Sequence, residues 1–126
     1  MILRPNPLDR MPLEFAVKLP HPERAVVDIA KLWDYCLNPR HARGRHKARV
    51  FAAVLGITRD NADLLRQALL AAASAAAVTE GDKDDYGQRY VLDCGVAGPG
   101  GTATVRSSWI VLTGEDFPRL TSCYVL

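Results

Sequence analysis

The sequence predicts an α+β fold, in which N-terminal helices pack on one face of a three- to four-stranded antiparallel meander sheet. Hydrophobic residues recur with helical spacing up to residue 77, and they alternate with polar residues from residue 88 onward. Short turns containing Gly or Pro separate the extended segments, and such turns join neighbouring antiparallel strands. Because the helices precede the strands, we expect the helices to cover one face of the sheet.

The length and composition are those of one globular domain. The chain has 126 residues, of which 48% are hydrophobic and 24% charged, so the core should need neither disulfides nor a structural metal. We expect residues 1–24 to be an N-terminal arm or short edge strand and residues 25–126 to form the single α+β domain. No segment has the length of a membrane span or the apolar core of a secretory signal, so a cytoplasmic protein without membrane contact is expected. The three cysteines are widely spaced, which indicates free thiols.

Three helices are predicted, at 28–37, 45–55 and 59–77. Asp28 is a suitable N-cap for the first helix, and Asn38 followed by Pro39 should end it. Gly56 stands where a left-handed residue commonly ends a helix, and Thr58 should cap the third, Ala-rich helix.

Three strands are predicted, at 88–95, 102–113 and 119–126. The preceding segment 79–87 is acidic and is expected to be a solvated loop, since its carboxylates lack the spacing of a calcium-binding loop. Two weaker extended segments, at 13–19 and 25–27, are expected to add short strands.

A dense basic segment lies at the start of the predicted second helix. Within 37–56, LNPRHARGRHKARVFAAVLG, five Lys/Arg and two His occur with no carboxylate between Arg40 and Arg49. Residues 1–56 as a whole carry ten Lys/Arg against five Asp/Glu. Positive charge at a helix start opposes the helix dipole, so we expect this segment to serve an anionic partner such as phosphate.

Several side chains of this segment and of the strands are candidates for chemistry. His41 lies in the predicted loop and suits proton transfer, whereas Lys47 is placed to pack its stem on the core with its ammonium at the sheet edge. His46 should project away from the core. Alternation along the strands predicts that six polar residues share the open face of the sheet: Arg89, Asp93, Arg106, Ser108, Arg119 and Thr121. The alternative is that these strand residues simply face solvent. No metal site is expected, because the two histidines of the basic segment lack carboxylate or cysteine neighbours.

From Lys31 onward the chain resembles a family of small bacterial domains of unknown function. The resemblance lies in KLWDYCLNPRHARGRHKARVFAAVLG, followed by DYGQRYVLD, GPGG, VRSSWIV and PRLTSCYVL. That family in turn resembles the metal-independent ribonuclease toxins named for barnase, EndoU, colicins and RelE. The resemblance implies N-terminal helices before a four-stranded antiparallel sheet, and cleavage of RNA by attack of the 2′-hydroxyl without a cofactor.

The same resemblance implies roles for individual residues. His41 and Lys47 match the helix-side motif, as base or acid and as charge stabiliser, while Thr121 and Tyr124 match the last-strand motif as phosphate donors. His46 falls at a variable position of the pattern. The RNA-binding candidates are Arg43, Arg45, His46, Arg49, Arg106, Trp109 and Arg119. Trp109 or Tyr124 can stack a base, although a place in the core is the favoured interpretation of Trp109. Such domains often accompany an antitoxin or immunity protein, which the resemblance implies as a partner.

Two other functions remain open at this point. The basic helix can belong to a non-catalytic module that binds nucleic acid or an acidic protein, and RNA would then be retained without being cleaved. It can also belong to a structural subunit whose basic patch meets the acidic segment of another copy.

Overall fold

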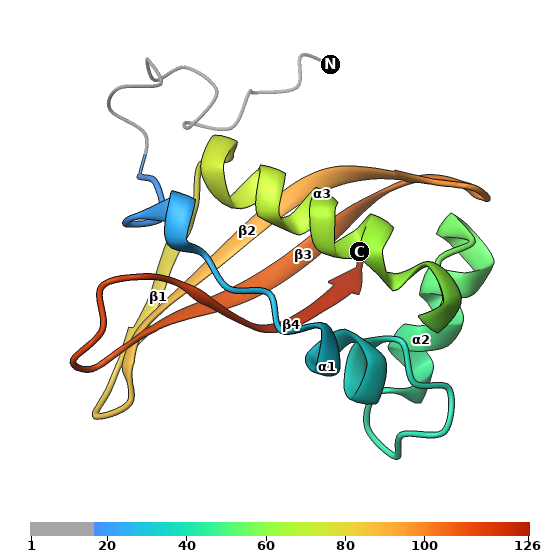
Figure 1. Cartoon of the computed structure of the whole chain (residues 1–126), viewed down its shortest axis with the longest axis horizontal. Helices are drawn as coiled ribbons and strands as arrows, with labels where there is room; N and C mark the ends of the chain where they lie inside the picture. The colour runs from blue at the N-terminus through green and yellow to red at the C-terminus, as the bar shows by residue number, and fades with distance from the viewer. Residues whose placement is uncertain (1–16) are drawn as a thin grey trace, which may run out of the picture.

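The computed structural model describes residues 17–126 and confirms the α+β fold (Figure 1). The four strands form one antiparallel sheet in the order β1-β2-β3-β4. Helix α3 lies across one face of this sheet, while α1 and α2 lie near the C-terminal end of β4. No helix among the described residues is long and apolar enough to cross a membrane.

The helical part of the chain is divided into short segments. These are η3 (Pro22–Arg24), α1 (Ile29–Lys31), η4 (Leu32–Cys36), α2 (Arg45–Val50), η5 (Phe51–Leu55), η6 (Arg59–Asn61) and α3 (Ala62–Ala75). The segments η3 and η6 are 3₁₀ turns, whereas η4 and η5 are π-helical turns that continue α1 and α2. The strands are β1 (Thr79–Lys83), β2 (Gly87–Gly98), β3 (Gly101–Leu112) and β4 (Arg119–Val125).

Local side-chain chemistry explains where these helices begin and end. Asp28 accepts a hydrogen bond from the backbone N–H of Ala30 at 2.9 Å and thereby caps α1. Thr58 and Asn61 form a capping box that begins η6. Gly56 ends η5 with φ 66°, in the left-handed region that glycine adopts without a steric penalty.

The expectation of a loop at 79–87 is wrong for its first five residues. Thr79–Lys83 forms β1, an edge strand whose residues are all exposed and whose backbone pairs with β2. The side chain of Gln88 on β2 also donates to the carbonyl of Gly81 at 2.9 Å. Polar composition hides this strand, because an exposed edge strand is held by pairing with its neighbour and buries no hydrophobic face of its own.

Of the two short strands expected near the N-terminus, the described residues 17–19 and 25–27 do not form strands of the sheet. Most of 13–19 lies outside the described residues, and Val17 contributes only a carbonyl that accepts from the N–H of Val78 at 2.9 Å. Val26 makes an isolated parallel bridge with Arg119, which ties the chain before α1 to the start of β4.

The hydrophobic core lies between α3 and the inner face of the sheet. Leu65 and Leu69 of α3 are fully buried, as are Val105 and, to 1% exposure, Trp109 of β3. The indole N–H of Trp109 donates to the hydroxyl of the buried Ser107 at 2.9 Å, so the polar atom of this large side chain is satisfied. Burial of each such side chain contributes about 1.5–3 kcal/mol to folding. Trp109 is therefore a core residue, which confirms the interpretation that the sequence favoured over a role in stacking an RNA base.

The C-terminal end of η5 packs directly on the turn between β2 and β3. The N–H of Gly100 in this turn donates to the carbonyl of Leu55 at 2.9 Å. A Cβ atom at Gly56 would lie 2.8 Å from the backbone nitrogen of Gly100, closer than such contacts occur. This contact of backbone on backbone fixes α2 and η5 relative to the sheet.

The substitution Gly56→Ala should lower the free energy of unfolding for two reasons. The left-handed backbone costs about 1–3 kcal/mol for a residue with a Cβ atom, and the contact with Gly100 adds a steric cost. Gly114→Ala is the matched control, because Gly114 also has positive φ (87°) but no atom lies within 4 Å of its added Cβ. Urea denaturation should show a larger loss for Gly56→Ala, and equal losses would contradict the packing role.

Candidate functional site

The basic segment is electrostatically distinct from the rest of the described chain. Three arginines of the strands each pair with a carboxylate, in Arg89–Asp84, Arg106–Asp93 and Arg119–Glu115. Within residues 17–126, by contrast, no ion pair involves any of the five Lys/Arg between residues 40 and 49. Arg43, Arg45, His46 and Arg49 are exposed, and Lys47 is partly buried. Unneutralised positive charge is therefore concentrated at the start of α2.

Lys47 reaches from α2 to the edge strand β4. Its ammonium Nζ donates to the hydroxyl of Tyr35 on η4 at 3.0 Å and to the hydroxyl of Ser122 on β4 at 3.3 Å. The same Nζ lies 4.8 Å from the ring centroid of Tyr35 and 5.7 Å from that of Tyr124. We call these four residues, Tyr35, Lys47, Ser122 and Tyr124, the Lys47 cluster.

The hydrogen bonds of the Lys47 cluster leave it rich in donors. A lysine ammonium can only donate, so the hydroxyl oxygens of Tyr35 and Ser122 must accept from it. The Tyr35 hydroxyl then keeps its own proton for an acceptor outside the cluster, and the ammonium has a third N–H, whereas the Ser122 hydroxyl is also hydrogen-bonded to the thiol of Cys36. No carboxylate of the described chain forms an ion pair with Lys47. Such an arrangement is complementary to an anion with several acceptor oxygens, of which phosphate is the common example.

His41 is held in the turn before α2 by backbone hydrogen bonds. Its Nδ1 accepts from the N–H groups of Arg43 and Gly44, both at 3.0 Å, and its ring packs edge-on against Tyr35 with centroids 4.8 Å apart. Because Nδ1 accepts, the proton of the neutral ring must sit on Nε2, which can then donate a hydrogen bond but cannot take up a proton. These contacts fix the orientation of the His41 ring, and its expected role as acid or base stays a prediction.

A β-bulge changes which residue of β4 meets Lys47. Ser108 pairs with Ser122, Trp109 pairs with Leu120, and the register shift leaves Thr121 as the extra residue. The hydroxyl of Thr121 donates to the carbonyl of Ser108 at 3.1 Å. The strand residue that contacts Lys47 is therefore Ser122, which was not among the predicted site residues.

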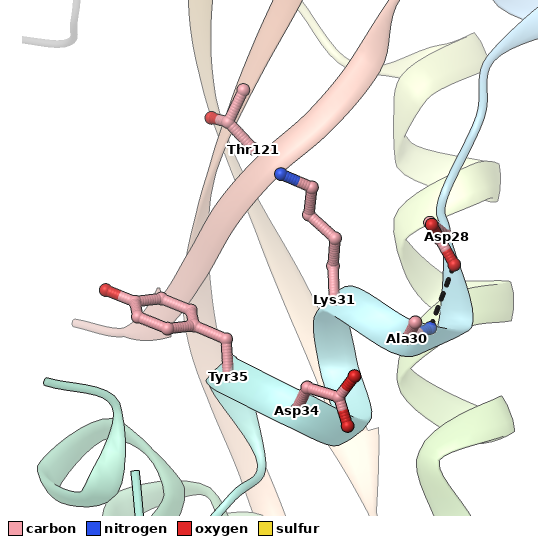
Figure 2. Close-up of a pocket in the computed structure, with 6 residues that line it drawn as sticks. All are labelled: Asp28, Ala30, Lys31, Asp34, Tyr35 and Thr121. Atoms are coloured by element: carbon pink, nitrogen blue, oxygen red, sulfur yellow. Dashed lines mark hydrogen bonds between the residues drawn. The ribbon is translucent and has the colours of Figure 1, made fainter. Parts of the chain in front are cut away.

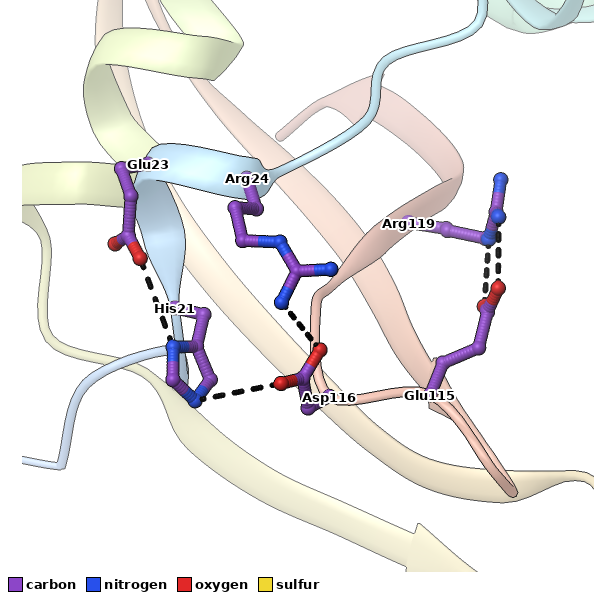
Figure 3. A network of polar contacts seen from close by, with 6 residues as sticks. All are labelled: His21, Glu23, Arg24, Glu115, Asp116 and Arg119. Atoms are coloured by element: carbon purple, nitrogen blue, oxygen red, sulfur yellow. Dashed lines mark hydrogen bonds and ion pairs between the residues drawn. The ribbon is translucent and has the colours of Figure 1, made fainter.

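The two strand arginines expected to clamp phosphate are occupied by carboxylates. Arg106 binds Asp93 through two hydrogen bonds of 2.9 and 3.0 Å, and Asp93 together with Tyr124 raises the pKa of Arg106 above its ordinary value. Arg119 makes two bonds of 2.8 and 2.9 Å to Glu115, whose pKa this guanidinium lowers. Figure 3 shows the Arg119 pair next to an ion-pair network of His21, Glu23, Arg24 and Asp116. Arg106 thus pairs with Asp93 between β3 and β2, and Arg119 pairs with Glu115 at the start of β4, so the charge of each arginine is compensated by a carboxylate.

A pocket of about 460 Å³ adjoins the Lys47 cluster (Figure 2). It is lined by Asp28, Ala30, Lys31, Asp34, Tyr35 and Thr121. Tyr35 belongs to both features, because its hydroxyl binds Lys47 while the residue also lines the pocket. Two neighbouring sites of different chemistry therefore share one aromatic side chain.

The thiols of Cys36 and Cys123 are buried close enough to Lys47 for its charge to act on them. A hydrogen bond with Cys123, followed by the charge of Lys47 and a bond with Ser122, lowers the pKa of Cys36 to about 7 against the opposing effect of burial. The same thiol pair and burial raise the pKa of Cys123. In residues 17–126 no group of three or more His, Cys, Asp or Glu side chains is placed to hold a metal ion.

Sequence reasoning found Lys47 and Tyr124 but missed Tyr35, Ser122 and Lys31. Tyr35 lies twelve residues before Lys47, so no helical spacing connects them, and Ser122 is displaced by a bulge that alternation cannot reveal. The one available signal was the hydroxyl-rich sequence Thr121-Ser122 of the last strand, in which either residue could face Lys47.

Residues 18–126 match the model of a protein family described as Domain of unknown function (DUF6883). The match covers both parts of the candidate site and all four strands. No curated protein matches the chain.

The substitution Cys36→Ser should change how stability depends on pH. A thiol whose pKa is about 7 in the folded state and near 9 in the unfolded state favours folding more as it ionises, so the parent should gain stability from about pH 7 to pH 9. Above pH 9 the raised pKa of Cys123 opposes any further gain, because that thiol ionises more readily in the unfolded chain. Denaturant titrations at pH 6.5, 7.5 and 8.5 should show this gain in the parent and a flatter profile in Cys36→Ser.

Proposed function

Because the chain belongs to the DUF6883 family, whose description assigns no activity, we propose a function from the site itself: the domain binds RNA through the phosphate backbone, with the Lys47 cluster as a phosphate site. The observation that carries this proposal is a partly buried ammonium with two hydroxyl partners and no ion pair in the described chain. A partly buried ammonium without a carboxylate partner is stabilised when an anion completes its environment.

The unpaired cations around the cluster support the same proposal. The turn and the helix that carry Lys47 also expose Arg43, Arg45 and Arg49. If one phosphate of an RNA strand binds at the Lys47 cluster, these arginines can contact the neighbouring phosphates of the same RNA strand. The choice of RNA over other polyanions rests on the sequence resemblance to ribonuclease toxins.

Metal-independent cleavage of this RNA is a second candidate function, and the chemistry of the Lys47 cluster favours it. RNA supplies its own nucleophile in the 2′-hydroxyl, so a protein must mainly orient the chain and stabilise charge on the phosphorane. Lys47 and the hydroxyl proton of Tyr35 are the donors that would do so. His41 would hold Tyr35 and the turn in place, because its Nδ1 is occupied by backbone donors.

The basic segment also suits the antitoxin or immunity protein that the sequence resemblance implies. An acidic partner would neutralise the same exposed arginines and would compete with RNA for them. Binding of such a protein and binding of RNA would then exclude one another.

Lys47→Met should weaken the binding of a single-stranded RNA by about tenfold or more, because the lost interaction joins two charged groups. Lys83→Met is the matched control, since Lys83 lies exposed on β1 and the substitution removes the same charge. Fluorescence anisotropy of labelled RNA in EDTA measures both variants. Equal affinities of Lys47→Met and the parent would refute the phosphate site.

Gel analysis of the same EDTA mixtures separates binding from cleavage. If the parent cuts RNA, Lys47→Met should cut about 10²–10³ times more slowly, as expected for loss of one donor to the transition state. Intact RNA after prolonged incubation with the parent would leave binding alone as the function.

The salt dependence of RNA binding should distinguish free arginines from paired ones. Arg45→Gln should reduce the slope of log K against log salt by about 0.7–1, the effect of one lost phosphate contact. Arg119→Gln should leave the slope almost unchanged, because Glu115 already occupies that guanidinium. If the two variants change the slope equally, the conclusion that the arginines of the basic segment are free to bind phosphate while those of the strands are neutralised would be contradicted.

A further inference from the structure

The pocket beside the Lys47 cluster has different chemistry from the cluster itself. Asp34 lines this pocket, and its carboxylate makes no ion pair or side-chain hydrogen bond within residues 17–126. Asp28 uses one carboxylate oxygen to cap α1 and keeps the other free. Thr121 also lines the pocket, and its hydroxyl donates a hydrogen bond to the carbonyl of Ser108. Lys31 is the single cationic donor of the lining.

This chemistry excludes a second phosphate and suits a nucleobase. Two carboxylates in the lining would repel a phosphate, whereas the edge of a base carries both N–H donors and acceptors. The volume of about 460 Å³ lies in the range of small-molecule sites. Figure 2 shows Lys31 and Tyr35 extending from the helical segment toward β4, with Asp28 and Asp34 on that same segment.

We propose that this pocket is a base-binding subsite that prefers a base with an exocyclic amino group, such as cytosine, over uracil. The amino group of cytosine can donate to the carboxylate of Asp34, which lines the pocket, and its ring nitrogen and carbonyl can accept from Lys31. Uracil has carbonyl oxygen where cytosine has this amino group, so it would place an acceptor against the negative charge of Asp34. Aspartate accepting from the amino group of cytosine is an established pairing in nucleic-acid recognition.

The position of Tyr35 connects the two subsites. Its hydroxyl binds Lys47 at 3.0 Å, and its ring forms part of the pocket wall, so a base in the pocket and a phosphate at Lys47 lie on either side of one residue. They can therefore belong to adjacent parts of one RNA strand. This inference rests on the proposed RNA binding and adds a specificity to it.

The test compares labelled oligo(C) and oligo(U) of equal length at pH 7.5 in EDTA. Both are pyrimidine strands with the same backbone charge, so a difference in affinity reports the base. We expect the parent to bind oligo(C) about tenfold more tightly, the effect of one hydrogen bond to a charged group. Equal affinities would overturn the proposal.

Asp34→Asn should reduce this preference severalfold, because an amide brings its own donor to the uracil carbonyl. Asp82→Asn, on the exposed strand β1, is the matched control that removes the same charge and should leave the preference intact. A preference for oligo(C) that survives in Asp34→Asn would also overturn the proposal.

Lys47→Met separates this proposal from the one on which it rests. This substitution should lower the affinities for oligo(C) and oligo(U) by the same factor and leave the ratio of the two affinities unchanged. If Lys47→Met binds both oligonucleotides as tightly as the parent, the proposed phosphate site is refuted. The base preference of Asp34→Asn tests the pocket alone and does not depend on that result. Circular dichroism of each variant establishes that it is folded.

Discussion

The close packing of η5 on the β2–β3 turn is the constraint on which the candidate site depends. The carbonyl of Leu55 accepts from Gly100, and the absence of a side chain at Gly56 lets the two backbones meet. With Phe51 and Leu55 fully buried, this contact sets the position of α2 against the sheet. Lys47 lies two turns before that contact, so its ammonium reaches β4 only because the end of the helix is held there.

The π-helical turn η4 brings the second component of the site into place. The N–H of Leu37 donates to the carbonyl of Leu32 at 2.7 Å, five residues earlier, which widens the last turn of the helix. Within this turn Cys36 is fully buried while Tyr35 is partly exposed and reaches Lys47. One short turn thus contributes both to the core and to the polar cluster.

The distribution of ion pairs gives the molecule a clear electrostatic division. Along the sheet, arginines are held by Asp84, Asp93 and Glu115, and their charge is compensated within the fold. The cations of the basic segment have no such partners in the part of the chain that the structure describes. This division matters more than the net charge of +2, because an anionic partner responds to local charge within about one Debye length.

The sequence by itself determined the fold class, three of the residues that begin or end helices, and the location of the basic segment. Hydrophobic periodicity, the caps at Asp28 and Thr58 and the left-handed Gly56 depend on residues within a turn or two, so local chemistry suffices. Only the tertiary structure decided that 79–83 is a strand and that Ser122 contacts Lys47. It also decided that His41 binds backbone and that the strand arginines are paired. Each of these depends on strand register or on partners far apart in the chain, which composition and spacing do not encode.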